Sequence, residues 1–388
     1  MTDPNPTFNT ERHVKYYLRC LKTFLPSAYT SNDSNRMLLA YLTLSGLDVL
    51  GVLQSKTTPE ERQGYIDWLY HCQVPSGGFR GFPGTDFGPG KRNKDNEAWD
   101  PANVPATFFA LVNLLVLGDD LSRVKRRECL EWLPKVQRAD GSFGEIIGPE
   151  GSVGGLVICD TAVVLLAYVS AIQTLTEQTY DGGMAESPFC ESHSGHTYCA
   201  VGSLDFVRRT SNDLKSVPLL SAGSNQFEAL ITWIASRQTA QLEEPEEDED
   251  DDDGQLEVTE TRSLDDRVHG LPNVQPIMAD TISCAGFNGR CNKYADTCYS
   301  FWNGATLMML DRYSVIDEVR NRRYLLEKTQ HIVGGFGKAP GDPPDLLHSY
   351  FGMVSLAFQG EAGLSPVDPT MGSSERTVRH LESLPWWQ

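Results

Sequence analysis

Three residues of the sequence offer the ligand types that hold a catalytic zinc ion. Asp296 and Cys298 lie two positions apart, and His348 follows about fifty residues later in an apolar stretch. An oxygen, a thiolate and an imidazole can bind Zn²⁺ and leave a fourth position open for chemistry. Each signal is weak alone, because a lone histidine in an apolar helix is more often a hydrogen-bonded core residue. A structural four-cysteine zinc site is disfavoured, because the chain has no C-x-x-C pair near these residues.

The residues around this trio add support for a binding site. Arg290 and Lys293 are cations suited to an anionic substrate, and Tyr299, Phe301 and Trp302 follow within a few positions. Aromatic side chains bury large areas and can line an apolar groove, although each one alone is consistent with ordinary core packing. This short run combines cationic, acidic, thiol and aromatic side chains, which suits a site that binds a metal, an anion and an apolar tail together.

A second group lies in the run CESHSGHTYC, residues 190–199. His193 could donate a hydrogen bond to an anion there, and the start of a helix would add to the binding. The alternative is a polar loop that ends in a helix cap.

A repeat of glutamine, glycine and an apolar residue runs through the chain. The pattern Q-x3-G-x-[FM] begins at Gln73, Gln137, Gln178 and Gln330. A fifth copy is broken, because Gln238 is followed by Gly286-Phe287 only after a much longer interval. We interpret residues 239–281 as an insertion into a repeat loop, where extra length costs little.

The segments between the repeat markers have helical spacing of apolar residues, and no run of alternating strands is evident. Helix pairs that repeat every forty to sixty residues predict a solenoid, which must be capped or closed. We expect an all-α fold that closes into an α/α toroid, a double ring of helix pairs, with the site in its central cavity.

Composition restricts the classes of function. The chain has 388 residues and a net charge of −19, but ten of the eleven residues 243–253 are acidic. Such a run is normally a solvated, disordered loop, with a tether for a basic partner as the alternative. The acidic balance disfavours nucleic acid, and no apolar run is long enough to span a membrane. Nine cysteines without a disulfide rhythm, and no visible secretion signal, favour a cytoplasmic location.

Three runs of the sequence resemble the β subunits of the protein prenyltransferases, most closely the geranylgeranyl type I branch. These runs are GFNGRCNKYADTCYSFWNGATLMML, VGGFGKAPGDPPDLLHSYFG and YDGGMAESPFCESHSGHTYCAVGSL. The resemblance implies one α/α-toroid domain over residues 10–365, interrupted by 239–281 and followed by a C-terminal tail, 366–388. It implies transfer of geranylgeranyl from geranylgeranyl diphosphate to the cysteine of C-terminal C-a-a-X proteins such as Rho-type GTPases. It also implies a helical α subunit as partner.

By motif position, the resemblance assigns the zinc ligands to Asp296, Cys298 and His348. It assigns the diphosphate to His193, Arg290, Lys293 and Tyr299, with Lys338 beside the reacting groups. The open zinc position would receive the thiol of the substrate cysteine and lower its pKa. The isoprenoid and peptide pocket would include Leu38, Cys199, Trp302, Leu347 and Phe351.

Three positions favour the geranylgeranyl branch. Lys338 replaces an Asp that farnesyl and Rab geranylgeranyl enzymes carry, which the farnesyl enzyme uses with Mg²⁺, so Mg²⁺ is not expected to be required. Leu347 replaces a bulky Tyr, and Leu38 replaces a Trp that stands beside the shorter farnesyl chain.

The chain also departs from the family pattern. Ser194 replaces a glycine of the family pattern. His196 occupies a position that is usually a small or an aromatic residue. An Asp-x-Arg motif is missing near Leu156. The alternatives that remain are a farnesyltransferase β subunit, a terpene cyclase and a non-catalytic toroid that binds proteins.

Overall fold

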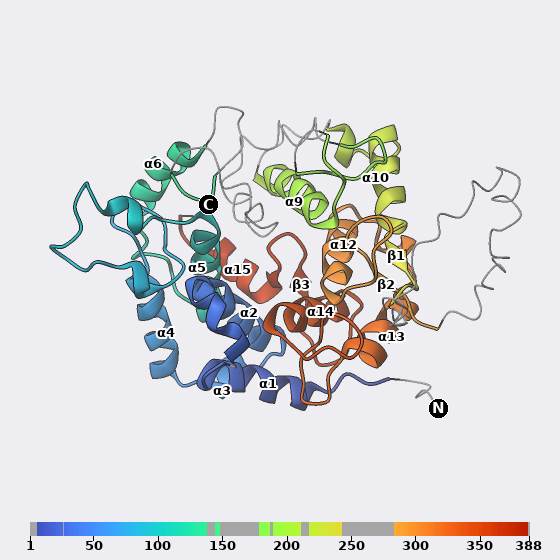
Figure 1. The fold of residues 1–388 in the computed structure, drawn as a ribbon, viewed down its shortest axis with the longest axis horizontal. Coiled ribbons are helices and arrows are strands. Elements are labelled where there is room, and N and C mark those ends of the chain that lie inside the picture. Colours follow the sequence, from blue (N-terminus) through green and yellow to red (C-terminus); the bar gives the residue numbers. More distant parts are fainter. Residues whose placement is uncertain are drawn as a thin grey trace, which may run out of the picture.

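The computed structural model describes residues 6–25, 27–137, 144–147, 178–186, 189–210, 217–242 and 283–386. The regular secondary structure of this part of the chain is almost wholly helical (Figure 1). The helices are α1 (Thr10–Lys22), α2 (Arg36–Val49), α3 (Leu53–Lys56), α4 (Pro59–His71), α5 (Val104–Leu117), α6 (Arg126–Val136), α9 (Ser194–Thr210), α10 (Asn225–Ala235), α12 (Thr297–Met309), α13 (Glu318–Arg323), α14 (Leu346–Phe358) and α15 (Glu375–Ser383). The strands form two short antiparallel pairs, β1 (Gln238–Thr239) with β2 (Gly286–Phe287) and β3 (Val367–Asp368) with β4 (Ser373–Ser374).

An inner layer of helices surrounds the centre of the molecule. α5 packs against α2, α2 against α14, α14 against α12, and α12 against α9. Most residues of these helices are buried, and in the apolar helix α5 every residue except Leu111 is buried. A helix that is apolar all round is stable only when other elements cover it. Helices α1, α4 and α10 lie outside this layer and pack on α2, α5 and α12. The expected α/α toroid is confirmed.

The glutamine repeat joins each outer helix to the next one. The repeat residues pair across a tight loop, as in Gln73 with Phe79 and Gln330 with Phe336. The Gln73 side chain accepts a hydrogen bond from Lys125 N, at the start of α6. The Gln330 side chain accepts one from Asn9 N, the cap of α1. The last repeat therefore hydrogen-bonds to the first helix, so this glutamine closes the ring.

The backbone conformation of the repeat loop and its close packing explain why the repeat needs glycines. Gly77 and Gly334 have φ values of +103° and +90°, in the region that side-chain-bearing residues avoid. A Cβ atom on Gly77 would lie 2.3 Å from Glu128 O in α6, and one on Gly334 would lie 2.2 Å from Arg12 O in α1. The repeat loop therefore contacts the backbone of the next outer helix directly.

The broken fifth copy has the same pairing as the intact ones. Gln238 pairs with Phe287 across β1 and β2, and its side chain bonds both backbone groups of Asp317, the cap of α13. Most of the expected insertion, 239–281, lies outside the described residues, so its limits stay a prediction. The copy at Gln137 also continues into residues outside the described part.

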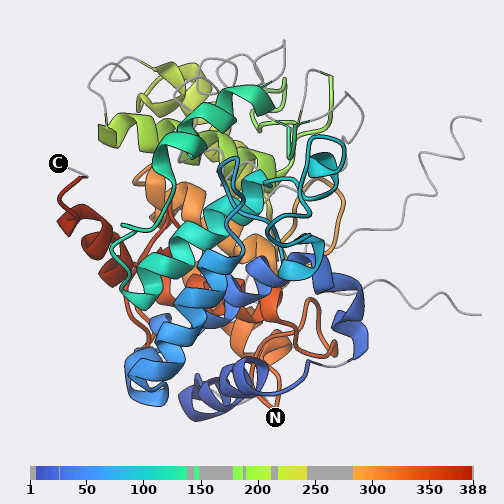
Figure 2. The same cartoon turned by 90° about the vertical axis from the view of Figure 1, so that its left-hand side faces the viewer.

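The sequence places residues 366–386 in a tail, but the first part of this segment, the β3–β4 loop, enters the centre of the ring. The loop between β3 and β4 lies among the inner helices in Figure 1, and α15 lies at the edge of the molecule in Figure 2. Gly372 O accepts hydrogen bonds from Tyr41 of α2 and Tyr350 of α14. The segment is thus fixed to two inner helices. No helix among the described residues is long and apolar enough to cross a membrane.

Candidate metal centre and apolar cavity

The three predicted metal ligands lie together at the starts of two neighbouring helices. Asp296 is the N-cap of α12, and its carboxylate accepts a hydrogen bond from Cys298 N at 2.8 Å. His348 lies in the first turn of α14, with its Nε2 atom 3.3 Å from Asp296 Oδ1. One ligand atom from each of Asp296, Cys298 and His348 lies within 4.8 Å of the other two. The trio is therefore placed to hold one ion.

Close packing of α12 and α14 brings the ligands together. Thr297, between the first two ligands, is fully buried and donates to Lys338 O and Gly337 O at 2.9 and 2.7 Å. Gly352 of α14 faces it, and a Cβ atom there would lie 2.9 Å from Thr297 Cγ2. The absence of a side chain at this glycine lets the two helices approach closely.

Asp345 is a residue of this centre that the sequence reasoning missed. It caps α14 by accepting from His348 N at 3.0 Å, and its second oxygen lies 2.5 Å from His348 Nδ1. The Nδ1–H group donates to the carboxylate in this arrangement, which leaves the Nε2 lone pair for a metal. An Asp three positions before the histidine, at a predicted helix start, is the signal that could have identified it.

The protonation of the trio depends on its burial. Burial, together with the Asp296 carboxylate, raises the pKa of the Cys298 thiol well above its usual value. Burial opposes the charged form of His348, but hydrogen bonds to Asp296 and Asp345 raise its pKa to about 9. A bound dication would reverse both tendencies, because metal ligands must be deprotonated. The donor set fits an ion that favours sulfur, nitrogen and oxygen together.

A group of donors lies next to the metal trio. His193 Nε2 is 3.2 Å from the hydroxyl of Tyr299, which follows Cys298 in α12. His193 Nδ1 accepts from Gly195 N at 3.1 Å, so the proton is on Nε2. Burial lowers the pKa of His193 to about 4, with further lowering from His196 and Arg290, so the ring is neutral at pH 7. His193 therefore offers a neutral N–H donor beside Tyr299.

The predicted cations lie on the exposed side of this group. Arg290 pairs with Glu191 at 3.1 Å, and both side chains are about half exposed. Lys293 is exposed, and its carbonyl accepts from Asn288 Nδ2 at 2.9 Å. Lys338 is also exposed, and its carbonyl contacts the start of α12. The exposed side chains of Lys293 and Lys338 can reorient toward an anion, whereas Arg290 would exchange its pairing with Glu191 for one.

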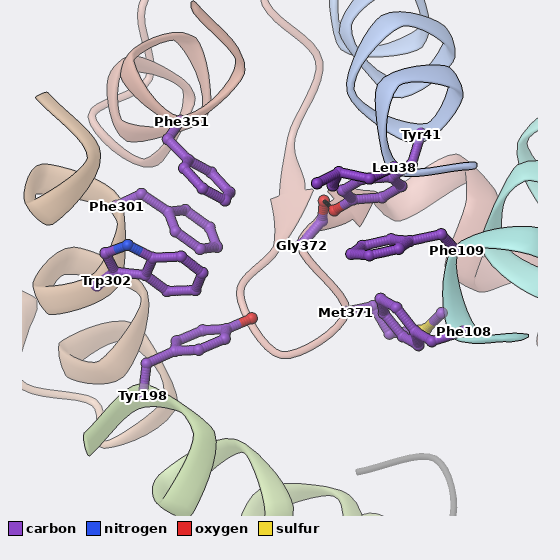
Figure 3. A pocket seen from close by; sticks show the side chains of 10 residues that line it. All are labelled: Leu38, Tyr41, Phe108, Phe109, Tyr198, Phe301, Trp302, Phe351, Met371 and Gly372. Atoms are coloured by element: carbon purple, nitrogen blue, oxygen red, sulfur yellow. Dashed lines mark hydrogen bonds between the residues drawn. The ribbon is translucent and has the colours of Figure 1, made fainter. Parts of the chain in front are cut away.

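A small apolar cavity with a volume of about 20 Å³, roughly room for one water molecule, lies deeper in the ring (Figure 3). Its lining residues come from α2, α5, α9, α12, α14 and the β3–β4 loop: Leu38, Tyr41, Phe108, Phe109, Tyr198, Phe301, Trp302, Phe351, Met371 and Gly372. Of the pocket residues expected from the sequence, Leu38, Trp302 and Phe351 line it. Cys199 is buried beside Tyr198, and Leu347 is half-buried on α14; neither lines this cavity.

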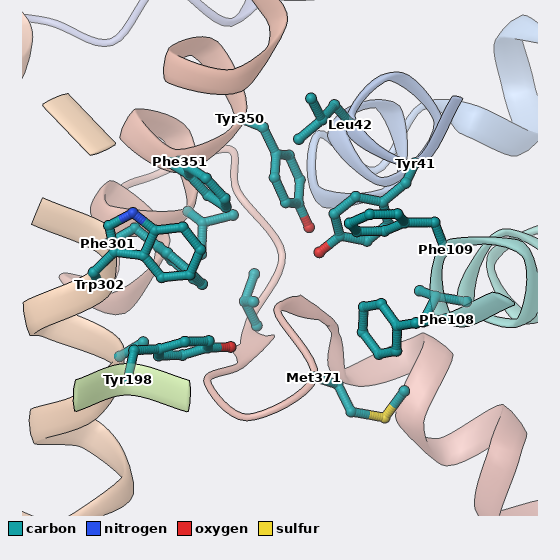
Figure 4. Close-up of a cluster of buried hydrophobic side chains, with 14 of the residues drawn as sticks. Tyr41, Leu42, Phe108, Phe109, Tyr198, Phe301, Trp302, Tyr350, Phe351 and Met371 are labelled. Carbon is teal, nitrogen blue, oxygen red and sulfur yellow. The ribbon is translucent and has the colours of Figure 1, made fainter. Parts of the chain in front are cut away.

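Tyrosine hydroxyls hold one wall of the cavity in place (Figure 4). Tyr41 and Tyr350 both donate to Gly372 O, and Tyr198 donates to Pro369 O and Thr370 O. The hydroxyls of these three rings are satisfied by the β3–β4 loop, and the apolar faces of Tyr41 and Tyr198 line the cavity. Sequence reasoning missed Met371 and Gly372 because it placed them outside the domain. The segment around Leu156 lies outside the described residues.

Comparison with known proteins identifies the family. Residues 8–373 match the family described as Prenyltransferase alpha-alpha toroid domain. The chain is 31% identical to the geranylgeranyl transferase type-1 subunit beta of Arabidopsis thaliana, over 96% of this chain and 90% of that protein. It is 29% identical to the protein of the same name from Dictyostelium discoideum, over 95% and 96%.

A solved structure has the same fold. The protein geranylgeranyltransferase-I of Candida albicans, complexed with GGPP, matches with a TM-score of 0.74 and 24% identity, over 97% of this chain and 99% of that one. The match to the family covers nearly all of the described ring, including the metal trio and the cavity wall at Gly372. The chain belongs to the prenyltransferase family of α/α-toroid proteins.

Proposed function

We propose that the chain is the catalytic β subunit of a protein geranylgeranyltransferase type I. The observation that carries the proposal is the convergence of Asp296, Cys298 and His348 beside the His193–Tyr299 donor pair. Two relatives at about 30% identity that span nearly the whole chain bear the name of this subunit. A ring that only binds proteins would not need a buried thiol, carboxylate and imidazole in contact.

We assign zinc to the trio. A tetrahedral zinc ion with bonds of about 2.0–2.3 Å holds its ligand atoms roughly 3–4 Å apart, which is compatible with the observed spacing. Three protein ligands leave the fourth position for a substrate thiol, and zinc bound there keeps that thiol deprotonated at neutral pH. Asp345 holds His348 in the tautomer that binds.

The donor group would hold the diphosphate of the prenyl substrate. Arg290 and Lys293 supply positive charge, and His193 Nε2–H and Tyr299 O–H supply neutral donors. The substrate sulfur forms a bond to C1 of the prenyl chain while the C1–O bond breaks, and the electron pair leaves with the diphosphate. Donors placed at the leaving oxygens stabilise that charge as it develops.

Two further residues favour the geranylgeranyl donor. An ammonium group at Lys338 can neutralise diphosphate without Mg²⁺, because it supplies the charge itself. Leu38 lines the apolar cavity and is smaller than the Trp of the farnesyl branch, which leaves room for a fourth isoprene unit. Both arguments favour this branch over the farnesyltransferase alternative.

The partners follow from the same assignment. We propose a helical α subunit as the stable partner and C-a-a-X proteins with a terminal Leu, such as Rho-type GTPases, as acceptors, in the cytoplasm. The resemblance places a second diphosphate lysine and the carboxylate-binding residue in the α subunit. The chain alone should then be inactive.

The test is transfer activity of the chain co-expressed with an α subunit. Geranylgeranyl and farnesyl diphosphates are compared on peptides that end in Leu or in Ser or Met, with and without Mg²⁺. We expect geranylgeranyl transfer to the Leu peptide without Mg²⁺. Cys298→Ala should abolish transfer, whereas the control Cys284→Ala, at a buried cysteine outside the trio, should retain it. A preference for farnesyl diphosphate, or transfer by Cys298→Ala, would refute the assignment.

A further inference from the structure

Arg237 is a buried cation that has no carboxylate partner among the described residues. It lies between α10 and β1, and its side chain is 5% exposed. Its Nε and Nη1 atoms have no hydrogen-bond partner, and no ion pair joins it to a carboxylate within the described residues. The guanidinium stacks on Trp233, with its carbon 4.9 Å from the ring centre. An uncompensated buried charge is costly, so an anion next to this group would be strongly stabilised.

Two side chains accept from this cation: Ser236, whose Oγ accepts from Arg237 Nη2 at 3.1 Å, and a cysteine. Arg237 Nη2 donates to Cys291 Sγ at 3.2 Å, and Cys291 itself is exposed. The loop around the thiol is fixed, because Asn288 N donates to Arg237 O and Asn288 Nδ2 donates to Lys293 O, both at 2.9 Å. Asn292 turns the chain sharply with φ +56°. The sulfur therefore contacts a buried cation and remains accessible from outside.

We propose that Cys291 is a reactive thiol that forms mixed disulfides with small anionic disulfides. Its thiolate would be a counter-ion that no described carboxylate gives Arg237, and the thiolate is the form that attacks a disulfide. The Cys291 sulfur bonds to one sulfur of the reagent, the reagent's S–S bond breaks, and the other half leaves as a thiolate. Arg290 and Lys293 flank the site and attract a reagent that carries carboxylates.

Modification at this position would act on donor binding. This consequence rests on the proposed function, because it requires that Arg290 and Lys293 hold the diphosphate. An adduct on Cys291 whose carboxylates pair with these two cations would compete with the diphosphate for them. A thiol reductant would remove the adduct and restore binding. The site would then couple prenyl transfer to the thiol–disulfide balance of its surroundings.

The modification is tested on the full chain, alone and co-expressed with an α subunit. The protein is incubated with glutathione disulfide at neutral pH, and adducts are located by mass spectrometry of peptides over time. We expect Cys291 to be modified at least tenfold faster than Cys190, the matched control, which is exposed but adjoins the acidic Glu191. Arg237→Gln should remove that advantage, and Arg237→Lys should retain part of it. Equal rates at the two cysteines in the unaltered chain would overturn the proposal.

Alkylation of the unaltered chain by iodoacetamide keeps the test independent of the variants. This reagent is uncharged, so Arg290 and Lys293 do not attract it, and its rate reports the reactivity of the sulfur itself. At neutral pH we expect Cys291 to be alkylated at least tenfold faster than Cys190. Equal alkylation rates at the two cysteines would contradict the role of Arg237.

The effect on function is measured by binding of geranylgeranyl diphosphate before and after modification. We expect at least a tenfold weaker affinity in the adduct, recovery with reductant, and no effect of the disulfide on Cys291→Ser. Unchanged affinity of a fully modified chain would refute the coupling. Failure of the unmodified heterodimer to transfer geranylgeranyl would refute the proposed function instead, so the two failures are distinguishable.

Discussion

Asp345 provides the sharpest test of how the metal centre is built. Its two carboxylate oxygens serve two different donors: Oδ1 accepts from His348 N, which caps α14, and Oδ2 accepts from His348 Nδ1. An asparagine has only one oxygen for these two donors. If that oxygen keeps the cap, the amide nitrogen faces Nδ1 and the proton of the ring moves to Nε2. Asp345→Asn should therefore keep the helix and lose the metal-binding tautomer.

The expected loss of zinc affinity and the expected loss of folding stability can be separated. Loss of a hydrogen-bond partner behind a metal-binding histidine typically weakens metal affinity by about 10–100-fold, or roughly 1.4–2.7 kcal/mol. Because Asp345→Asn also disfavours the required tautomer, we expect a loss of about 100-fold. Asparagine caps helices about as well as aspartate, so the cap itself contributes less than about 0.5 kcal/mol to the change in the free energy of unfolding of the zinc-free protein. That free energy should fall further because the carboxylate that helps raise the pKa of His348 is lost. Asp345→Ala should lose the same affinity and about 1 kcal/mol of stability as well.

The assay is competition for zinc with a chelator of known affinity, together with thermal unfolding of the zinc-free chain. Asp342→Asn is the matched control, because it removes a carboxylate from the same loop. The Asp342 carboxylate accepts a hydrogen bond from Ala339 N and does not contact the histidine. Zinc affinity of Asp345→Asn within threefold of the unaltered chain would refute the orienting role. Equal affinity losses in both asparagine variants would mean that general charge, and not the Nδ1 contact, is responsible.

Three other changes test different parts of the structure. Lys338→Asp should make transfer dependent on Mg²⁺, because the carboxylate needs a cation where the ammonium supplied charge; rates without Mg²⁺ that match the unaltered chain would contradict this role. Leu38→Trp should shift the ratio of kcat/KM at least tenfold toward farnesyl diphosphate by filling the cavity, measured with both donors on one peptide. His13 is buried between Phe8 and Phe336, and burial lowers its pKa to about 4. The unfolded chain therefore binds its proton first, and the free energy of unfolding should fall by up to about 3 kcal/mol as pH drops from about 6.5 to about 4. His13→Asn should lessen that fall, as followed by denaturant unfolding.

The repeat shows how far the sequence could predict the fold. The spacing from Gln73 to Phe79 occurs four times in the chain, so the sequence was sufficient to predict helix pairs and a closed ring. The reason for the glutamine was not visible, because its partner is the start of the next outer helix, up to about 320 residues away for Gln330 and Asn9. Sequence spacing does not reveal contacts that only ring closure creates.

The candidate site was predictable in part for a similar reason. Asp296, Cys298 and His348 belong to motifs that can be read along the chain, and the structure brings them together. Asp345 was missed because its side chain acts through a neighbour and resembles an ordinary helix cap. Met371 was missed because it reaches the cavity from the C-terminal segment. Their roles depend on packing between distant segments, which no local pattern encodes.

The central claim is that a metal at Asp296, Cys298 and His348 serves prenyl transfer to a thiol. The most direct measurement is the rate of geranylgeranyl transfer to a Leu-ended C-a-a-X peptide by the heterodimer before zinc removal, after it, and after zinc is restored. We expect transfer to disappear with the zinc and to return when one equivalent is added back. An undiminished rate in the zinc-free heterodimer, or no transfer by the zinc-loaded one, would contradict the account.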